Sequence, residues 1–239
     1  DWLAPFAEKA RKRGDKGEFW WELRTCAYYD EFEKPKINYG HFQSKPLYSF
    51  DMNKNYSNNK AYIIPNSDSF LLGYLNSNVC WFVFTAMTTM VRGGFFEATT
   101  QNIVKLPIPK ANKQEKAHIA QLAKECQQLA EQRYQQQHTL RRRIPDLRPA
   151  DCEAKLSKKL MAWWELDFSA FQQAIKQRYK YAMTLQERIE WQTLFDDYQA
   201  KIQDQSQQLH TKETELNQAV YRLFQLTHDE IELLESHLR

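Results

Sequence analysis

Five large apolar residues recur at intervals of seven near the C-terminal end of the chain. They are Phe195, Ile202, Leu209, Leu216 and Leu223. A seven-residue repeat keeps one apolar seam on one side of a helix, and a partner helix must cover that seam. The sequence therefore predicts a long helix in an antiparallel hairpin or bundle. Packing inside the chain is favoured over docking of a separate partner.

The expected partner helix lies earlier in the chain. Its apolar residues keep a spacing of three or four and are Ile119, Leu122, Cys126, Leu129 and Leu140. The run Arg141-Arg142-Arg143-Ile144-Pro145 is expected to end this helix. Shorter helices are expected between the two long ones, at Trp163-Trp164 and from Phe168 to Tyr181.

The glycines divide the chain into two parts. All six lie at or before position 94, and residues 111–239 contain none. Between the parts stands Leu106-Pro107-Ile108-Pro109, whose two prolines bar a continuous helix. We expect a mixed α+β domain at 1–110 and a helical domain with long antiparallel helices at 111–239, an α+β fold class overall.

Short elements are expected in the first part. A helix is predicted from Trp2 to Ala10, and a second from about Phe70 to Val83, capped by Ser67-Asp68-Ser69. Aromatic and β-branched runs predict strands at 19–24, 36–39, 47–51, 61–65 and 101–106. Trp20 and Trp21 are expected in the core, because bulky aromatic side chains dominate core burial.

Composition limits the classes of protein that fit. The chain has no run of 18 apolar residues, so no membrane span is expected, and residues 1–10 lack the layout of a signal peptide. We therefore expect a cytoplasmic protein. The four cysteines stand far apart in the sequence, as expected for reduced thiols. The first residue is not Met, so a piece of a longer chain is expected.

Charge is distributed unevenly. Residues 1–110 carry 14 Lys/Arg and 11 Asp/Glu, and residues 111–183 carry 14 and 8. Residues 184–239 carry 5 and 11. The first 183 residues are therefore suited to a polyanion, which would repel the remainder.

Signatures of catalysis are weak. No glycine-rich loop follows a strand, and the six histidines are scattered without metal-ligand spacing. Asp146, Glu153 and Lys155 superficially match a magnesium-dependent nuclease pattern. The gap is short, and residues 150–161 are expected to be helical, so a solvated Glu/Lys pair is favoured. We expect no catalytic residue and no metal site in this chain.

Several segments of the first part occur in a characteristic order. They are Phe19-Trp20-Trp21-Glu22-Leu23-Arg24, Glu33-Lys34-Pro35-Lys36-Ile37, Ser57-Asn58-Asn59-Lys60-Ala61-Tyr62-Ile63-Ile64-Pro65, Leu71-Leu72-Gly73-Tyr74-Leu75-Asn76-Ser77, Arg92-Gly93-Gly94-Phe95 and Lys105-Leu106-Pro107-Ile108-Pro109. This order resembles the C-terminal specificity domain of TaqI-like adenine methyltransferases and of combined type II restriction–modification enzymes. The resemblance spans nearly all of residues 1–110. The helical part resembles the C-terminal helices of that family only in character.

The resemblance implies that DNA recognition and catalysis lie in different domains of one parent chain. In the family, a preceding domain binds S-adenosylmethionine and methylates the N6 of adenine, and some members carry an Mg²⁺-dependent nuclease domain further upstream. The Asn-Pro-Pro-aromatic motif that holds the flipped adenine does not occur here. The implied partners are double-stranded DNA and the catalytic domain of the same parent chain. No cofactor is expected in this fragment, and the oligomeric state stays open.

Candidate DNA-binding residues follow from charge and backbone freedom. Lys34, Lys36, Lys45 and Lys60 are candidates for neutralising phosphates. Arg92 precedes Gly93-Gly94, where the backbone can approach a ligand closely, and an arginine there can fork onto guanine or clamp a phosphate. A structural turn with Arg92 paired to a carboxylate is an equal alternative.

Two polar segments complete the candidate set. Asn58 and Asn59 either contact bases or shape a turn, and the turn is favoured. Tyr39, His41, Gln43 and Ser44 form a polar-aromatic segment that either enters a groove or faces solvent.

Three functions remain in competition. Sequence-specific recognition of duplex DNA is the leading hypothesis. A helical scaffold without DNA affinity is the second, supported by the seven-residue seam. A stand-alone nuclease using Asp146, Glu153 and Lys155 is the third, and we expect no cleavage.

Overall fold

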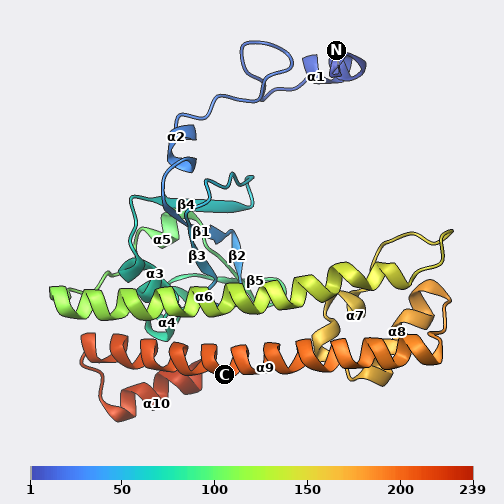
Figure 1. The fold of residues 1–239 in the computed structure, drawn as a ribbon. Coiled ribbons are helices and arrows are strands. Elements are labelled where there is room, and N and C mark those ends of the chain that lie inside the picture. The colour runs from blue at the N-terminus through green and yellow to red at the C-terminus, as the bar shows by residue number, and fades with distance from the viewer. Residues whose placement is uncertain (1, 239) are drawn as a thin grey trace.

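The computed structural model describes residues 2–238 and has two parts (Figure 1). Two long helices, α6 (Lys113–Arg143) and α9 (Leu185–Leu223), lie side by side along their length. Two small antiparallel sheets stand over the N-terminal part of α6. The predicted fold class, a mixed α/β region followed by long antiparallel helices, is confirmed.

Each sheet has three strands, in the orders β3-β1-β4 and β2-β6-β5. The strands are β1 (Lys36–Gly40), β2 (Phe42–Gln43), β3 (Tyr48–Asp51), β4 (Ala61–Pro65), β5 (Met90–Val91) and β6 (Phe95–Glu97). The central strand β1 pairs Ile37 with Phe50 of β3 and with Ile64 of β4.

The remaining helices are short. In the first part they are η1 (Ala4–Phe6), α1 (Ala7–Arg11), α2 (Tyr29–Phe32), α3 (Ser69–Leu75), α4 (Asn78–Met87) and α5 (Thr100–Ile103). In the second part they are η2 (Ile144–Leu147), α7 (Lys158–Met161), η3 (Trp163–Glu165), α8 (Phe168–Tyr179) and α10 (His228–His237).

The predicted seam is confirmed and is used inside the chain. Phe195, Ile202, Leu209 and Leu216 are all buried on α9, and Leu223 packs partly buried at its end. Each long helix begins at a capping box, formed by Asn112 with Glu115 on α6 and by Thr184 with Glu187 on α9. Such boxes satisfy backbone N–H groups that the first turn leaves unpaired.

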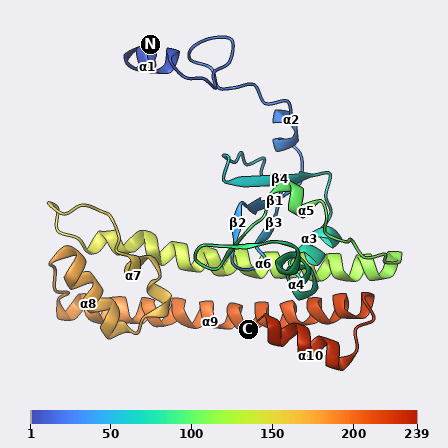
Figure 2. The same cartoon turned by 180° about the vertical axis from the view of Figure 1, so that it is seen from behind.

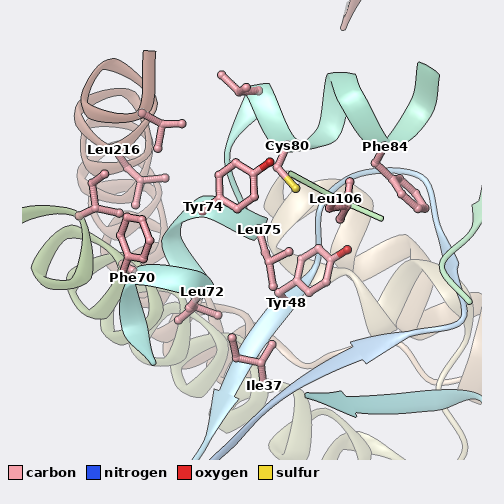
Figure 3. Packing of buried hydrophobic residues seen from close by; sticks show 14 of the residues in the cluster. Ile37, Tyr48, Phe70, Leu72, Tyr74, Leu75, Cys80, Phe84, Leu106 and Leu216 are labelled. Carbon is pink, nitrogen blue, oxygen red and sulfur yellow. The ribbon is translucent and has the colours of Figure 1, made fainter. Parts of the chain in front are cut away.

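Two apolar cores lie at opposite ends of the helical pair. The distal core gathers the end of α6, the short helices α7 and α8, and the start of α9. The proximal core joins α3, α4 and the sheets to the start of α6 and the end of α9, and Figure 3 shows Leu216 beside Phe70. The first part therefore packs directly on the helices, and the division at residue 110 stays a prediction.

Gly73 explains how closely α3 approaches the helices. A Cβ atom there would lie 2.8 Å from Ile119 Cγ2 and 3.2 Å from Leu216 Cδ1. A side chain at this position would therefore require a shift of α3 or of the Ile119 and Leu216 side chains, because packed interiors leave no room for such close carbon contacts.

Several expected elements differ in the structure. Residues 19–24 form turns, with one isolated bridge between Lys16 and Leu23, because no neighbouring strand pairs with them. Trp21 is half exposed, so the prediction that it lies in the core was wrong. Residues 101–106 belong to α5 and a turn instead of a strand. The expected helix 150–161 is reduced to α7.

The helix expected from Phe70 to Val83 is broken in two at Asn76-Ser77. Asn76 turns its side-chain amide to β3, where it bonds both backbone groups of Tyr48, at 3.1 and 3.0 Å. Ser77 then caps α4 by accepting a hydrogen bond from the Cys80 N–H. Within residues 2–238, no single helix is long and apolar enough to cross a membrane, although α3 and α4 pass that test jointly as a bent pair.

Candidate nucleic-acid interface

His41 is the point where the two sheets meet. Its backbone N–H donates to the Lys60 carbonyl at 3.0 Å, and its carbonyl accepts from the Ala98 N–H at 2.7 Å. Its ring stacks on Phe42, with centroids 4.3 Å apart, and its Nε2 lies 3.9 Å from Glu97 Oε1. His41 is therefore held on three sides while part of its side chain faces solvent.

The hairpin of β5 and β6 turns at Arg92, Gly93 and Gly94. The φ angles of Gly93 and Gly94 are +89° and +78°, a left-handed backbone that other residues adopt only with strain. All three residues are exposed. The paired glycines thus serve a tight turn, and within residues 2–238 no ion pair engages Arg92, so its alternative role as a carboxylate partner is not seen.

The sheet register brings Lys45 to the same end as Arg92. β2 pairs antiparallel with β6, Phe42 opposite Glu97 and Gln43 opposite Phe96. The chain leaving β2 at Gln43 therefore runs toward the Arg92 turn, from which β6 begins. Lys45 and Arg92 are both exposed at this end, and His41 stands at the other.

The segment before β4 is a turn held by Asn58. Its Oδ1 accepts from the Lys60 N–H at 2.9 Å, and its carbonyl accepts from the Ala61 N–H at 3.1 Å. The turn interpretation agrees with the structure, although neither asparagine has a positive φ. Asn59 and Lys60 are exposed beside the His41 backbone.

Lys36 does not reach solvent, which corrects its expected role as a phosphate contact. It is fully buried, and its Nζ donates to Asp51 Oδ2 and to the Phe32 carbonyl, at 2.8 and 2.7 Å. Burial alone would raise the pKa of Asp51. Hydrogen bonds from Lys36, Asn38 and the backbone of Asn53 and Asn55 outweigh burial and lower that pKa to about 2.

Tyr39 and Gln43 are also buried, so their expected place in a groove-facing segment was wrong. Tyr39 packs between Tyr48 and Tyr62, with ring centroids 5.5 and 5.4 Å away, and burial raises its pKa. The Gln43 amide donates to the Gly40 carbonyl. Alternation along the strands explains this, because successive side chains point to opposite faces.

Lys34 is exposed but lies apart from the other candidates. It follows α2, at the end of β1 opposite to His41, and its Nζ is 2.7 Å from Glu31 Oε1. The hydrogen bond and charge of Glu31 raise the pKa of Lys34. The structure thus places His41, Lys45 and Arg92 at the ends of the second sheet, with Asn59 and Lys60 before β4 and beside the His41 backbone, and leaves Lys34 outside.

Some surface residues of this sheet were missed by the sequence reasoning. Phe42, Met90 and Phe95 are large apolar side chains that stay exposed on β2, β5 and β6. The adjacent pair Phe95-Phe96 could have predicted an exposed aromatic side chain, because only one of two neighbours on a strand can face the core. We name the set His41, Phe42, Lys45, Asn59, Lys60, Arg92 and Phe95 the hairpin surface.

The helices contribute charge next to the hairpin surface. Desolvation raises the pKa of Glu213 on α9, and the positive charges of Arg133, His210 and Lys45 oppose that rise. Lys45 therefore lies close enough to Glu213 on α9 for its charge to stabilise the ionised carboxylate. The sheet end that carries Lys45 thus lies near the part of the helices that carries Arg133 and Glu213.

A groove with an apolar lining lies elsewhere. It has a volume of about 790 Å³ between α6 and the β3 end of the first sheet, and its lining includes Phe50, Met52, Phe70, Ala117 and Ala120. None of the candidate residues lines it.

The nuclease hypothesis finds no metal centre in the part of the chain that the structure describes. No three His, Cys, Asp or Glu side chains between residues 2 and 238 come together as metal ligands. Glu153 pairs with Arg178 at 3.3 Å, and Asp146 lies 3.8 Å from Arg143. Each of these two carboxylates is therefore paired with an arginine and is not part of a metal site.

A small α+β unit with an exposed glycine hairpin and basic edges has the character of a recognition module carried on a helical support. Residues 6–108 match the family model described as the TaqI-like C-terminal specificity domain. This part of the chain is therefore a TaqI-like C-terminal specificity domain. Residues 112–220 match a second model, described as a domain of unknown function (DUF8810). No curated protein matches the chain.

Proposed function

We propose that this chain recognises a specific sequence in double-stranded DNA, as the specificity region of an N6-adenine methyltransferase or a fused restriction–modification enzyme. The specificity domain at 6–108 implies a role in DNA target recognition. Methyl transfer, with S-adenosylmethionine as cofactor, is assigned to a catalytic domain outside residues 1–239. A nuclease domain, where one is fused, would require Mg²⁺.

The observation that carries this proposal is the hairpin surface. It combines the cations Lys45, Lys60 and Arg92 with exposed apolar side chains and two glycines that leave the backbone bare. Lysines position a duplex through its phosphates, whereas an arginine at a bare turn can read the edge of guanine. A two-stranded hairpin fits the major groove by its dimensions.

The buried residues of the candidate set have a supporting role in this account. The Lys36–Asp51 pair holds the segment 53–55 through the Asn53 and Asn55 backbone N–H groups. Tyr39 and Gln43 stabilise the sheets from the buried side, Tyr39 by packing between Tyr48 and Tyr62 and Gln43 by its hydrogen bond to the Gly40 carbonyl. The two long helices then support this scaffold through the proximal core, whose lining comes from both parts of the chain.

The scaffold alternative loses its main support. Its evidence was the seven-residue seam, and Phe195, Ile202, Leu209 and Leu216 are covered within the chain itself. A seam that is already buried offers no apolar surface for a partner helix. The assignment of residues 1–110 and 111–239 as separate domains is retained as a proposal.

The experiment compares binding of random-sequence duplex DNA by the chain and by a triple variant, Lys45→Gln with Lys60→Gln and Arg92→Gln. Removing these cations should weaken binding and reduce the slope of log K against log salt by about 0.9 for each phosphate that is no longer neutralised. The control removes three exposed lysines of the helices, Lys113, Lys176 and Lys201. Equal weakening in both variants, or no duplex binding by the unaltered chain, would refute the proposal.

A further inference from the structure

The first described residues form a segment without a core. Residues 2–24, which we name the N-terminal arm, contain no buried residue. Six large apolar side chains of the arm are exposed, namely Trp2, Leu3, Phe6, Phe19, Trp21 and Leu23. Exposed apolar area on this scale, on the order of a few hundred Å², is typical of a surface that another part of a protein covers.

The arm also stays apart from the rest of the fold. It stands away from both sheets and from the long helices in both views (Figures 1 and 2). Within residues 2–238, the hydrogen bonds, the ion pair and the aromatic contacts of the arm each join two of its own residues. No part of the described chain therefore covers the exposed rings.

The loop that presents Phe19 and Trp21 is nevertheless preformed. Arg13 Nη2 donates to the Glu22 carbonyl at 2.6 Å and to the Trp20 carbonyl at 3.4 Å, which closes the loop. The rings of Phe19 and Trp21 stack with their centroids 4.8 Å apart. A surface that is already ordered loses less entropy on binding than a flexible segment does.

The charges of the arm argue against a duplex as its cover. Six Lys/Arg and four Asp/Glu are interspersed along it. Four of these cations are engaged within the arm, namely Arg11, Lys12, Arg13 and Lys16. Binding of a polyanion depends on cations that can reach phosphates, whereas aromatic side chains beside arginines are typical of the centre of a protein interface.

The domain to which the arm belongs indicates what covers it. Residues 6–108 form the specificity domain, so most of the arm is part of that domain, yet the rest of the described chain supplies it with no core. The family is described as a C-terminal domain, which follows another part of its chain. A part tethered beside the arm meets it at an effective concentration of about millimolar, well above that of a second copy in dilute solution.

We propose that the N-terminal arm is the docking surface for the part of the parent protein that precedes the specificity domain. The stacked rings of Phe19 and Trp21 would enter an apolar recess of that part. This inference rests on the proposed function, in which the preceding part is the catalytic domain. The arm continues through α2 into β1, so docking would hold the catalytic domain at a fixed distance from the hairpin surface.

Hydroxyl-radical footprinting, read residue by residue by mass spectrometry, compares this chain alone with the longer parent protein. We expect the oxidation of the six exposed apolar side chains of the arm to be severalfold slower in the parent. Leu185 and Ile189, which are exposed on α9, serve as the internal control and should react equally in both proteins.

A single substitution tests whether the rings carry the contact. Trp21 and Tyr134 are 50% and 51% exposed, so Trp21→Ala and Tyr134→Ala remove rings of comparable exposure. In the parent, Trp21→Ala should raise the oxidation of Phe6 and Leu23 toward the rate of the chain alone, and Tyr134→Ala should leave it unchanged. Each rate is divided by that of the isolated chain with the same substitution, which removes local effects of the lost ring.

Equal oxidation of the arm in the chain and in the parent would overturn the inference, as would a coding sequence with no preceding domain. Protection that develops in the isolated chain would also overturn it. A rise with protein concentration would assign the arm to a second copy, and a rise with added duplex would assign it to DNA. In each case, duplex binding sensitive to Lys45, Lys60 and Arg92 would leave the proposed function standing.

Discussion

The side-chain amide of Gln127 on α6 bonds both backbone groups of Phe50 on β3. Gln127 Oε1 accepts from the Phe50 N–H at 2.7 Å, and Gln127 Nε2 donates to the Phe50 carbonyl at 2.9 Å. The amide thus takes the place of the next strand at an edge that would otherwise be open. It also ties the specificity domain to the helical part across 77 positions of sequence.

Replacing Gln127 by alanine should destabilise the fold by about 1 to 3 kcal/mol, because a partly buried N–H and carbonyl lose their partners. Urea unfolding followed by circular dichroism measures this loss. The neighbouring Gln128→Ala is the control, since Gln128 is exposed and makes no such bond among residues 2–238. Equal stability of the two variants would show that the amide pairing contributes nothing.

Acidification should weaken the fold through Asp51. Its folded pKa of about 2 lies below its ordinary value of 3.8, so the carboxylate stabilises the fold fully above that ordinary value. The contribution, about 2 kcal/mol, is lost as pH falls from about 4 through about 2, with about half gone at pH 3. Urea midpoints between pH 7 and pH 3 measure it.

Asp51→Asn is the matched comparison for the pH series. It should cost about 3 to 5 kcal/mol at pH 7, because Lys36 is then buried without its counter-charge. The stability gap between the two proteins should narrow on acidification, since only the unaltered chain has a carboxylate to protonate. A gap that stays constant down to pH 3 would contradict the assigned role of Asp51.

Arg92→Ala should weaken DNA binding by about 1 to 3 kcal/mol and relax the preference at one base position if the side chain reads a base. Folding should change little, because Arg92 is exposed and makes no ion pair in the described chain. Lys105→Ala, also exposed, is the control. Unchanged affinity and unchanged site preference would remove Arg92 from the interface.

Leu209→Ala should cost about 2 to 5 kcal/mol, because Leu209 is buried in the seam between α6 and α9 and truncation leaves a cavity. Leu194→Ala on the same helix removes a leucine that is half exposed, and it should change stability by less than about 0.5 kcal/mol. Thermal or urea unfolding compares the pair. Similar losses for both variants would mean that the seam is not a packed interface.

The helical half follows closely from the sequence because its signal is local and periodic. The seven-residue spacing of Phe195, Ile202, Leu209 and Leu216 predicts the apolar seam. The two capping boxes are likewise short, contiguous sequence patterns. The break at Asn76-Ser77 is different, because Asn76 bonds to Tyr48, 28 positions away. No periodicity within residues 70–83 carries that information.

The candidate site was harder to predict, because exposure depends on partners far along the chain. Lys36 looked like Lys45 and Lys60 in the sequence, yet strand pairing places Asp51 directly opposite it. Tyr39 and Gln43 have side chains directed into the fold by strand alternation. The short strands 42–43 and 95–97 carry too few residues for their faces to be assigned in advance.

Selection from a duplex pool with a randomised central segment tests the central claim most directly. If the hairpin surface reads DNA, successive rounds should enrich one short sequence, and Arg92→Ala should relax the preference at a defined position within it. Retention of all sequences alike, or retention of none, would contradict the account.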